Sequence, residues 1–274
     1  MTGYVTVDGA LAFVEDHRVP DDPTAPAVLC LHTAGQSGVQ WRHVTPGLVA
    51  AGYRVVVPDL PGHGRSEPAP DGPVDDLGAY AAWLLALADA TGLDRFAVAG
   101  CSIGGKIALD LAVRASDRLT AVVAMAADAW TGGRPSTRGL RRELVDVAAP
   151  SRSDRTELGT LAVLGRATEP ERARLIAAMH RREDPVVSNS DLIGWASHDL
   201  REQLPRITCP LHLVVGADDL WLDVDRVRWA SSRIPGARCT VLDGVGHYPM
   251  EEMPGFAALL DGWLRELTAG TEAA

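Results

Sequence analysis

Residues 100–104 read G-C-S-I-G, which matches the pattern G-x-S-x-G and places Ser102 where it could act as a nucleophile. The apolar residues 95–100 predict a buried strand, and residues 103–114 have the pattern of a helix. A sharp turn between strand and helix would raise the Ser102 hydroxyl above the edge of a sheet, where it can attack a carbonyl carbon. Small neighbouring residues suit such a turn because they leave room for the backbone.

A serine hydroxyl is a weak nucleophile until a base removes its proton and an acid holds that base in the right tautomer. Both partners follow Ser102 along the chain: Asp218 and Asp219 come after one strand-like run, and His247 comes after the next. These turns lie at the carboxyl ends of predicted strands, where parallel α/β sheets place their active sites. The order of residue types therefore predicts a catalytic triad, with either aspartate as the acid.

Short apolar strands alternate with helices along much of the chain. Strands are predicted at residues 4–7, 11–14, 27–32, 53–58, 95–100, 119–126, 211–215 and 239–242, and helices at residues 39–51, 74–91, 103–114, 223–231 and 254–267. Strands of this length that alternate with helices favour a parallel sheet covered on both faces.

The alternation stops near residue 130 and resumes near residue 207. The intervening segment has helical patterns at residues 151–164, 170–179 and 190–204 and no convincing strand. We therefore predict an α/β core made of residues 1–130 and 207–274, with residues 131–206 inserted as a helical cap. His180 and His198 fall in the predicted cap and are expected to be solvated.

The bulk properties of the chain argue against some classes of partner. The chain has 274 residues, is 46% hydrophobic and carries a net charge of −10, which argues against nucleic-acid partners and anionic membrane surfaces, since both require a basic face. It shows no signal peptide and no apolar stretch of transmembrane length, so we expect a cytoplasmic protein. No spacing suggests a metal cluster or a phosphate-binding loop, so no metal and no cofactor are expected. The oligomeric state is left open.

Several motifs, taken together and in order, resemble those of the α/β-hydrolase family with a helical cap. They are the turn at His32, the D-x-x-G-x-G-x-S loop at Asp59–Ser66, the Gly100–Gly105 stretch, the Gly216–Asp219 turn and the segment Gly246–Pro249. The resemblance extends over essentially the whole chain. It implies the α/β-hydrolase fold, a mostly parallel sheet with helices on both faces and an inserted helical cap.

The resemblance also implies roles for the residues of the predicted triad. Ser102 resembles the nucleophile and His247 the general base. The family usually places its acid three residues after the glycine of the preceding turn, which is Asp219 here. Asp218 is the adjacent alternative, and Asp128 matches the position of the acid in some relatives.

An oxyanion hole needs two backbone N–H groups aimed at the oxygen that becomes negative. One is the N–H of Ile103, directly after the nucleophile. By resemblance the other is the N–H of Ala34, two residues after His32. The family usually has glycine after this histidine, whereas this chain has Thr33, whose branched side chain does not readily take the backbone angles open to glycine. The turn is therefore expected to differ or to be strained, and the Thr33 hydroxyl is a further candidate donor.

Four residues are candidates for the wall of a substrate pocket: Thr33, Trp130, Trp221 and Tyr248. Trp130 precedes the predicted cap and Trp221 follows the acid turn, so both are placed to line an apolar pocket. Packing between cap and core would explain these tryptophans equally well.

These observations predict a cofactor-independent serine hydrolase that cleaves a small carboxylic ester or lactone through an acyl-enzyme. A C–C bond hydrolase or a thioesterase with the same triad is an alternative, although C–C hydrolases often carry tryptophan after the catalytic histidine, where this chain has Tyr248. An alternative from another class is a small-molecule receptor, or a catalyst of a biosynthetic rearrangement, on the same fold.

Overall fold

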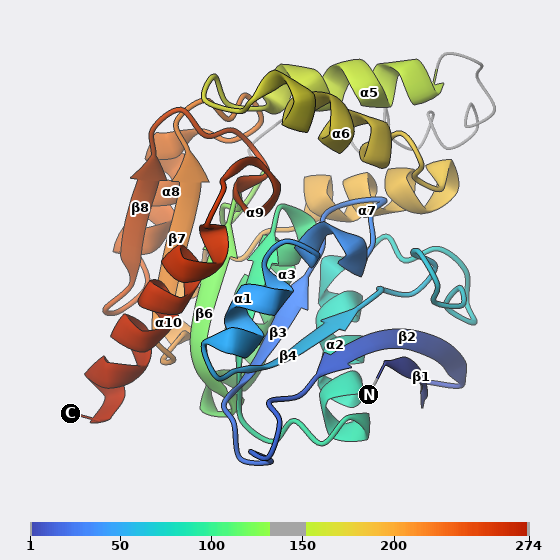
Figure 1. Cartoon of the computed structure of the whole chain (residues 1–274). Coiled ribbons are helices and arrows are strands. Elements are labelled where there is room, and N and C mark those ends of the chain that lie inside the picture. Colours follow the sequence, from blue (N-terminus) through green and yellow to red (C-terminus); the bar gives the residue numbers. More distant parts are fainter. Residues whose placement is uncertain (1, 132–151, 273–274) are drawn as a thin grey trace.

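A single eight-stranded sheet forms the centre of the computed structural model, which describes residues 2–131 and 152–272 (Figure 1). The strands are β1 (Gly3–Val7), β2 (Ala10–His17), β3 (Ala27–Leu31), β4 (Arg54–Pro58), β5 (Phe96–Cys101), β6 (Leu119–Met125), β7 (Leu211–Gly216) and β8 (Arg238–Leu242). Their order in the sheet is β1-β2-β4-β3-β5-β6-β7-β8. The pairs β1–β2 and β2–β4 are antiparallel and the others are parallel, so the predicted mostly parallel sheet is confirmed.

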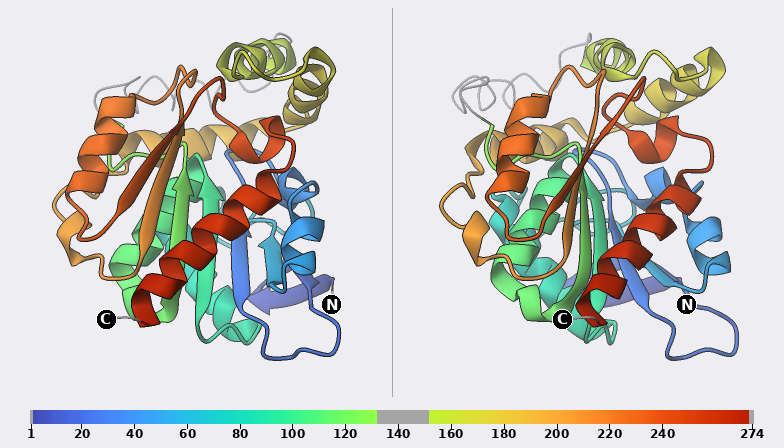
Figure 2. Two further views of the ribbon diagram at one scale, coloured as in Figure 1. Left: turned by 60° about the vertical axis from the view of Figure 1, so that its left-hand side comes forward. Right: turned by 90° about the vertical axis from the view of Figure 1, so that its left-hand side faces the viewer.

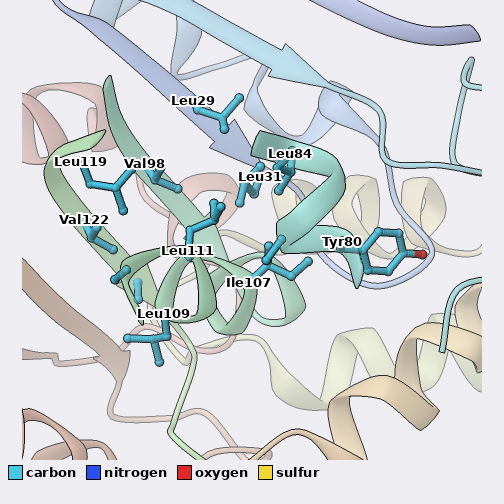
Figure 3. Packing of buried hydrophobic residues seen from close by; sticks show 14 of the residues in the cluster. Leu29, Leu31, Tyr80, Leu84, Val98, Ile107, Leu109, Leu111, Leu119 and Val122 are labelled. Atoms are coloured by element: carbon cyan, nitrogen blue, oxygen red, sulfur yellow. The ribbon is translucent and has the colours of Figure 1, made fainter. Parts of the chain in front are cut away.

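Helices cover both faces of this sheet (Figure 2). They are α1 (Thr45–Ala50), α2 (Leu77–Ala90), α3 (Ile103–Ala115), α8 (Val224–Ser232), α9 (Pro249–Glu252) and α10 (Phe256–Glu272), with 3-10 helices at Gly38–Trp41, Ser116–Arg118 and Leu204–Arg206. Successive strand side chains point to opposite faces, so Leu29 packs in the cluster formed with α2, α3 and α8, and Val28 packs in the cluster formed with α1 and α10. Figure 3 shows part of the first cluster, where Ile107 and Leu111 of α3 meet side chains of the strands and of α2.

Three further helices lie over the carboxyl ends of the strands: α5 (Arg152–Val163), α6 (Pro170–His180) and α7 (Pro185–Ser197) (Figure 1). Helices α5 and α6 pack against each other, and α7 contacts α2 and α3. The division into a core (residues 1–130 and 207–274) and a cap (residues 131–206) stays a prediction, and residues 132–151 of that cap lie outside the described residues. None of the helices within the described ranges is long and apolar enough to cross a membrane.

The largest differences from the sequence prediction concern two helices. The helix predicted at residues 39–51 is divided into a 3-10 helix and α1, because Pro46 lacks an N–H and starts a new helix. The helix predicted at residues 190–204 is α7, which begins and ends earlier. The Asp184 carboxylate caps its start by accepting hydrogen bonds from two backbone N–H groups, and the extended backbone of His198 ends it.

Candidate active site

The strand order creates a crevice above β3 and β5. After β3 the chain continues to β4 on one side, whereas after β5 it continues to β6 on the other side. In open α/β sheets, ligands bind at the carboxyl ends of the strands where the order reverses in this way. Ser102 follows β5 and His32 follows β3, so the predicted nucleophile and one predicted oxyanion loop both reach this crevice.

Ser102 lies at a turn with an unusual backbone conformation for a residue other than glycine, φ 58° and ψ −119°. A conformation of this kind costs on the order of 1–3 kcal/mol and persists only where the surrounding structure enforces it. The Ser102 N–H donates to the carbonyl of Met125 at 2.9 Å. A Cβ at Gly104 would lie 2.6 Å from the carbonyl oxygen of His32, so β5, α3 and the neighbouring loop approach closely. The predicted strand-to-helix turn at the serine is confirmed.

His247 and Asp219 form a buried pair in the turns after β8 and β7. The His247 Nδ1 atom lies 2.7 Å from Asp219 Oδ2. The other Asp219 oxygen accepts hydrogen bonds from the N–H groups of Trp221 and Leu222, at 2.8 and 3.2 Å. Burial opposes ionisation of Asp219, but the attraction of His247 and these hydrogen bonds outweigh it and hold the pKa of Asp219 below its ordinary value. An ionised Asp219 accepts a hydrogen bond from Nδ1–H, which fixes the tautomer in which Nε2 is the basic nitrogen.

Ser102 and His247 line the same cavity, which has a volume of about 380 Å³. The His247 Nε2 atom is buried and makes no hydrogen bond within the described part of the chain. A basic imidazole nitrogen that shares a cavity with a serine hydroxyl is suited to act as its general base. The volume falls in the range of sites for small molecules.

The two other candidate aspartates bind cationic side chains instead of His247. Asp218 accepts a hydrogen bond from the backbone N–H of Arg166 at 2.8 Å and pairs with its guanidinium. Asp128 is buried between Lys106 and Arg226, at 2.8 and 2.7 Å. Among the described contacts of these three aspartates, only Asp219 reaches the histidine.

The loop that carries His247 is held by Glu252, a residue that the sequence analysis missed. The buried Glu252 carboxylate accepts hydrogen bonds from the backbone N–H groups of Gly165, Gly246 and Tyr248, each at 2.8 Å. Because two of these residues flank His247, the carboxylate fixes the backbone on both sides of the imidazole. The available signal was the pair of glutamates between Met250 and Met253, so soon after the candidate base.

The loop after β3 is held on both sides of Ala34. The N–H of Thr33 donates to Gln40 Oε1 and that of Gly35 donates to Asp191 Oδ2, each at 2.8 Å. The left-handed conformation of this loop falls on Gly35, with φ 65°, so the absence of glycine at position 33 introduces no such strain. The Thr33 hydroxyl is bonded to Gln40 Oε1 at 3.1 Å, which engages the donor that was considered for the oxyanion.

Asp191 of α7 ties this helix to the core. Its carboxylate is completely buried and accepts, besides the Gly35 N–H, hydrogen bonds from His63 Nε2 and the Tyr80 hydroxyl, each at 2.8 Å. Burial opposes a charge on His63, but the Asp191 carboxylate outweighs it and raises the pKa of His63 above its ordinary value. A buried ion pair therefore joins α7 to the loop before α2.

The prediction that His180 and His198 are solvated is wrong, since both are buried. His180 Nε2 lies 2.9 Å from Glu251 Oε2, which also accepts a hydrogen bond from Gln40 Nε2 at 2.8 Å. Burial opposes ionisation of Glu251, but His180 and Gln40 hold its pKa below the ordinary value. His198 Nε2 lies 3.0 Å from Asp110. These carboxylates are distant in the sequence, so no local pattern marked the histidines as buried.

Of the predicted pocket residues, Thr33, Trp221 and Tyr248 line the cavity, as does Ala34. The Trp221 ring packs edge-on against His247, with centroids 4.6 Å apart. Trp130 is not among the described residues of the cavity wall. Its ring instead packs against Trp229, 4.8 Å between centroids, and beneath a guanidinium group.

The sequence and the fold agree with a known family. A family model of the alpha/beta hydrolase fold matches residues 26–254, so the chain belongs to this family. The predicted fold is thereby confirmed.

Particular relatives are hydrolases. The chain is 30% identical over 249 residues to the pimeloyl-[acyl-carrier protein] methyl ester esterase of Aromatoleum aromaticum, a match that covers 86% of this chain and 96% of that protein. It is 30% identical over 244 residues to 2-hydroxy-6-oxononadienedioate/2-hydroxy-6-oxononatrienedioate hydrolase 1 of Dechloromonas aromatica, covering 82% and 81%. A solved thermophilic esterase from Thermogutta terrifontis is similar in fold, with a TM-score of 0.85, 24% identity, and 98% and 99% of the two chains covered. The chain is thus similar to hydrolases over most of its length.

Proposed function

We propose that this protein is a serine hydrolase that cleaves a small carboxylic ester or lactone through an acyl-enzyme and needs no cofactor. The observation that supports this best is the arrangement in one cavity of Ser102, at its turn, and of His247, whose Nε2 is unbonded within the described residues. Asp219 binds the opposite nitrogen of the same imidazole. A nucleophile, a base and a group that orients the base are the parts that acyl transfer requires.

In the first half of the reaction, Ser102 Oγ attacks the carbonyl carbon while His247 Nε2 takes the hydroxyl proton. The carbonyl π electrons move to oxygen, and the N–H groups of Ile103 and Ala34 donate hydrogen bonds to the resulting oxyanion. When the carbonyl re-forms, the bond to the leaving oxygen breaks, and this oxygen takes the proton from His247. Asp219 stabilises the imidazolium that exists between the two proton transfers.

In the second half, a water molecule takes the place of the alcohol. His247 removes one water proton as the oxygen adds to the acyl carbon, and the same proton returns to Ser102 Oγ when the acyl-enzyme bond breaks. The products are the carboxylic acid and the alcohol, which remain one molecule when the substrate is a lactone.

The direct test is turnover of p-nitrophenyl acetate, butyrate and octanoate by the wild type and by Ser102→Ala. We expect turnover in the wild type and its loss in the variant, with an unchanged melting temperature that shows the variant is folded. The preferred chain length reports the usable length of the cavity. Equal turnover by both proteins would contradict the assignment of Ser102.

A second candidate is hydrolysis of a C–C bond in a vinylogous diketone. The relative from Dechloromonas aromatica, named as a hydrolase of 2-hydroxy-6-oxononadienedioate, favours it. Tyr248 follows His247 here, where C–C hydrolases often have tryptophan, which favours the ester reaction. Incubation with that compound, followed by mass spectrometry, separates the candidates, because only C–C hydrolysis yields two shorter fragments.

A further inference from the structure

One face of α5 forms part of the wall of the cavity that contains Ser102. The α5 residues in this wall are Arg152, Arg155, Thr156, Gly159 and Thr160. They recur at spacings of three and four positions, so they share one side of the helix. This side brings two arginines to a cavity in a chain whose net charge is −10.

The acidic residues of α5 are paired outside the cavity wall. Glu157 Oε2 lies 2.7 Å from the guanidinium of Arg181, and Asp154 Oδ1 lies 3.7 Å from it. None of these three residues lines the cavity. Their charges therefore do not neutralise the arginines on the other side of the helix.

Among the described residues of the wall, Glu183 is the acidic one, and both of its oxygens are engaged. Oε1 accepts hydrogen bonds from Arg152 at 3.1 Å and Thr156 at 2.8 Å, and Oε2 accepts one from Ser188 at 2.6 Å. Glu183 thus balances the charge of Arg152. Arg155 is exposed and lines the cavity, and no described residue forms an ion pair or hydrogen bond with it, so within the described ranges its positive charge is not compensated.

Two buried donors in the same wall also lack acceptors among the described residues. Arg152 Nε and Asn189 Nδ2 make no hydrogen bond to any residue in the described ranges. Asn189 is completely buried, and its Oδ1 accepts from Arg152 at 2.7 Å, which orients the amide and leaves Nδ2 as a donor. The groups of α5 and α7 in this wall that lack partners among the described residues are all donors, so the group that complements them accepts hydrogen bonds and carries negative charge, as a carboxylate does.

We propose that Arg155, Arg152 and Asn189 form a subsite for a second carboxylate on the acyl part of the substrate. This inference rests on the proposed ester hydrolysis at Ser102. It makes half-esters of dicarboxylic acids the preferred substrate class over neutral esters of the same chain length. The planar guanidinium of Arg155 supplies the charge and can donate two parallel hydrogen bonds to a carboxylate, which a lysine ammonium cannot.

The test compares matched methyl esters by titrating the acid that is released. Monomethyl glutarate is paired with methyl valerate, monomethyl adipate with methyl hexanoate, and monomethyl suberate with methyl octanoate. The two esters of a pair have the same number of acyl carbons, but only the first carries a second carboxylate. We expect the wild type to show a higher kcat/KM for the half-ester in at least one pair. Arg155→Gln should lower this preference about tenfold, the range of one charged hydrogen bond, and Arg155→Lys should restore part of it.

Arg174→Gln is the matched control. Arg174 is an exposed arginine of α6 that does not line the cavity, so its replacement should leave the preference unchanged. An equal preference in the wild type and in Arg155→Gln, or no preference for any half-ester, would overturn the proposal.

A binding measurement separates this inference from the proposed function. In the Ser102→Ala background, calorimetric titration with monomethyl adipate and methyl hexanoate requires no turnover. Tighter binding of the half-ester that is lost when Arg155→Gln is added supports the subsite. This holds even if no ester is hydrolysed, because a lack of hydrolysis contradicts only the proposed reaction. Equal binding of the two esters would overturn the subsite while leaving ester hydrolysis standing.

Discussion

The two sides of the cavity are stabilised in different ways. On the sheet side, the turn between β5 and α3 is held by apolar packing and by backbones so close that Gly104 has no room for a side chain. On the helix side, the buried carboxylate of Asp191 in α7 accepts hydrogen bonds from the core, and the buried carboxylate of Glu251 in α9 pairs with His180 of α6. The position of the candidate nucleophile therefore depends on shape, whereas that of the helices above it depends on charge pairing.

The largest effect is expected from the candidate acid on the sheet side. Asp219→Asn removes the charge that holds the His247 tautomer, so kcat for p-nitrophenyl butyrate should fall about a thousandfold or more. Asp218→Asn is the matched control, since Asp218 pairs with Arg166 near the surface, and it should change kcat little. Similar losses in both variants would contradict the assignment of the acid.

On the helix side, the largest effect is expected from Asp191→Asn. The amide keeps the shape of the side chain but leaves the buried His63 without its counter-charge, which should lower the free energy of unfolding by about 3 kcal/mol. Urea denaturation at pH 7 measures this difference. Asp184→Asn at the start of α7 is the control, because asparagine caps a helix as well as aspartate does. If the two variants were equally stable, the ion pair would not be what anchors α7.

The sheet side should respond to added volume instead of removed charge. In Gly104→Ala the new methyl group would meet the carbonyl oxygens of His32 and Leu31 at 2.6 and 2.7 Å, so we expect a loss of about 1–3 kcal/mol. Gly262→Ala adds the same group to α10, where no atom apart from the neighbouring backbone of the helix lies within 4 Å, and should raise stability by up to about 1 kcal/mol. Thermal unfolding of both variants measures these changes in stability. An unchanged stability of Gly104→Ala would contradict the close packing at this turn.

The smallest effect is the pH dependence of the helix-side anchor. Because Asp191 raises the pKa of His63 in the folded state, the pair stabilises the protein fully below the unfolded value of about 6.5 and less as the pH rises through the folded value. Burial lowers the pKa of His32 in the wild type to about 4, which lies below the pH range of this comparison. The destabilisation by Asp191→Asn should therefore be larger at pH 6 than at pH 9, and a difference of the opposite sign would contradict the pair.

The same contrast explains which features could be predicted from the sequence. The strands and the turn at Ser102 follow from apolar runs and small residues within a few positions of each other. The buried carboxylates were missed because their burial depends on distant partners: His63 and Asp191 are 128 positions apart. The sequence could not place Trp130 for a related reason, since a tryptophan near a predicted pocket packs equally well beside it.

The most direct test of the central claim is a reaction with a fluorophosphonate, followed by intact mass measurement and peptide mapping. An activated serine displaces fluoride and retains the phosphonyl group, so the adduct identifies the nucleophile without knowledge of the substrate. The account predicts one adduct on Ser102, slower labelling of Asp219→Asn and none of Ser102→Ala. An adduct on another residue, or equal labelling of Ser102→Ala, would contradict it.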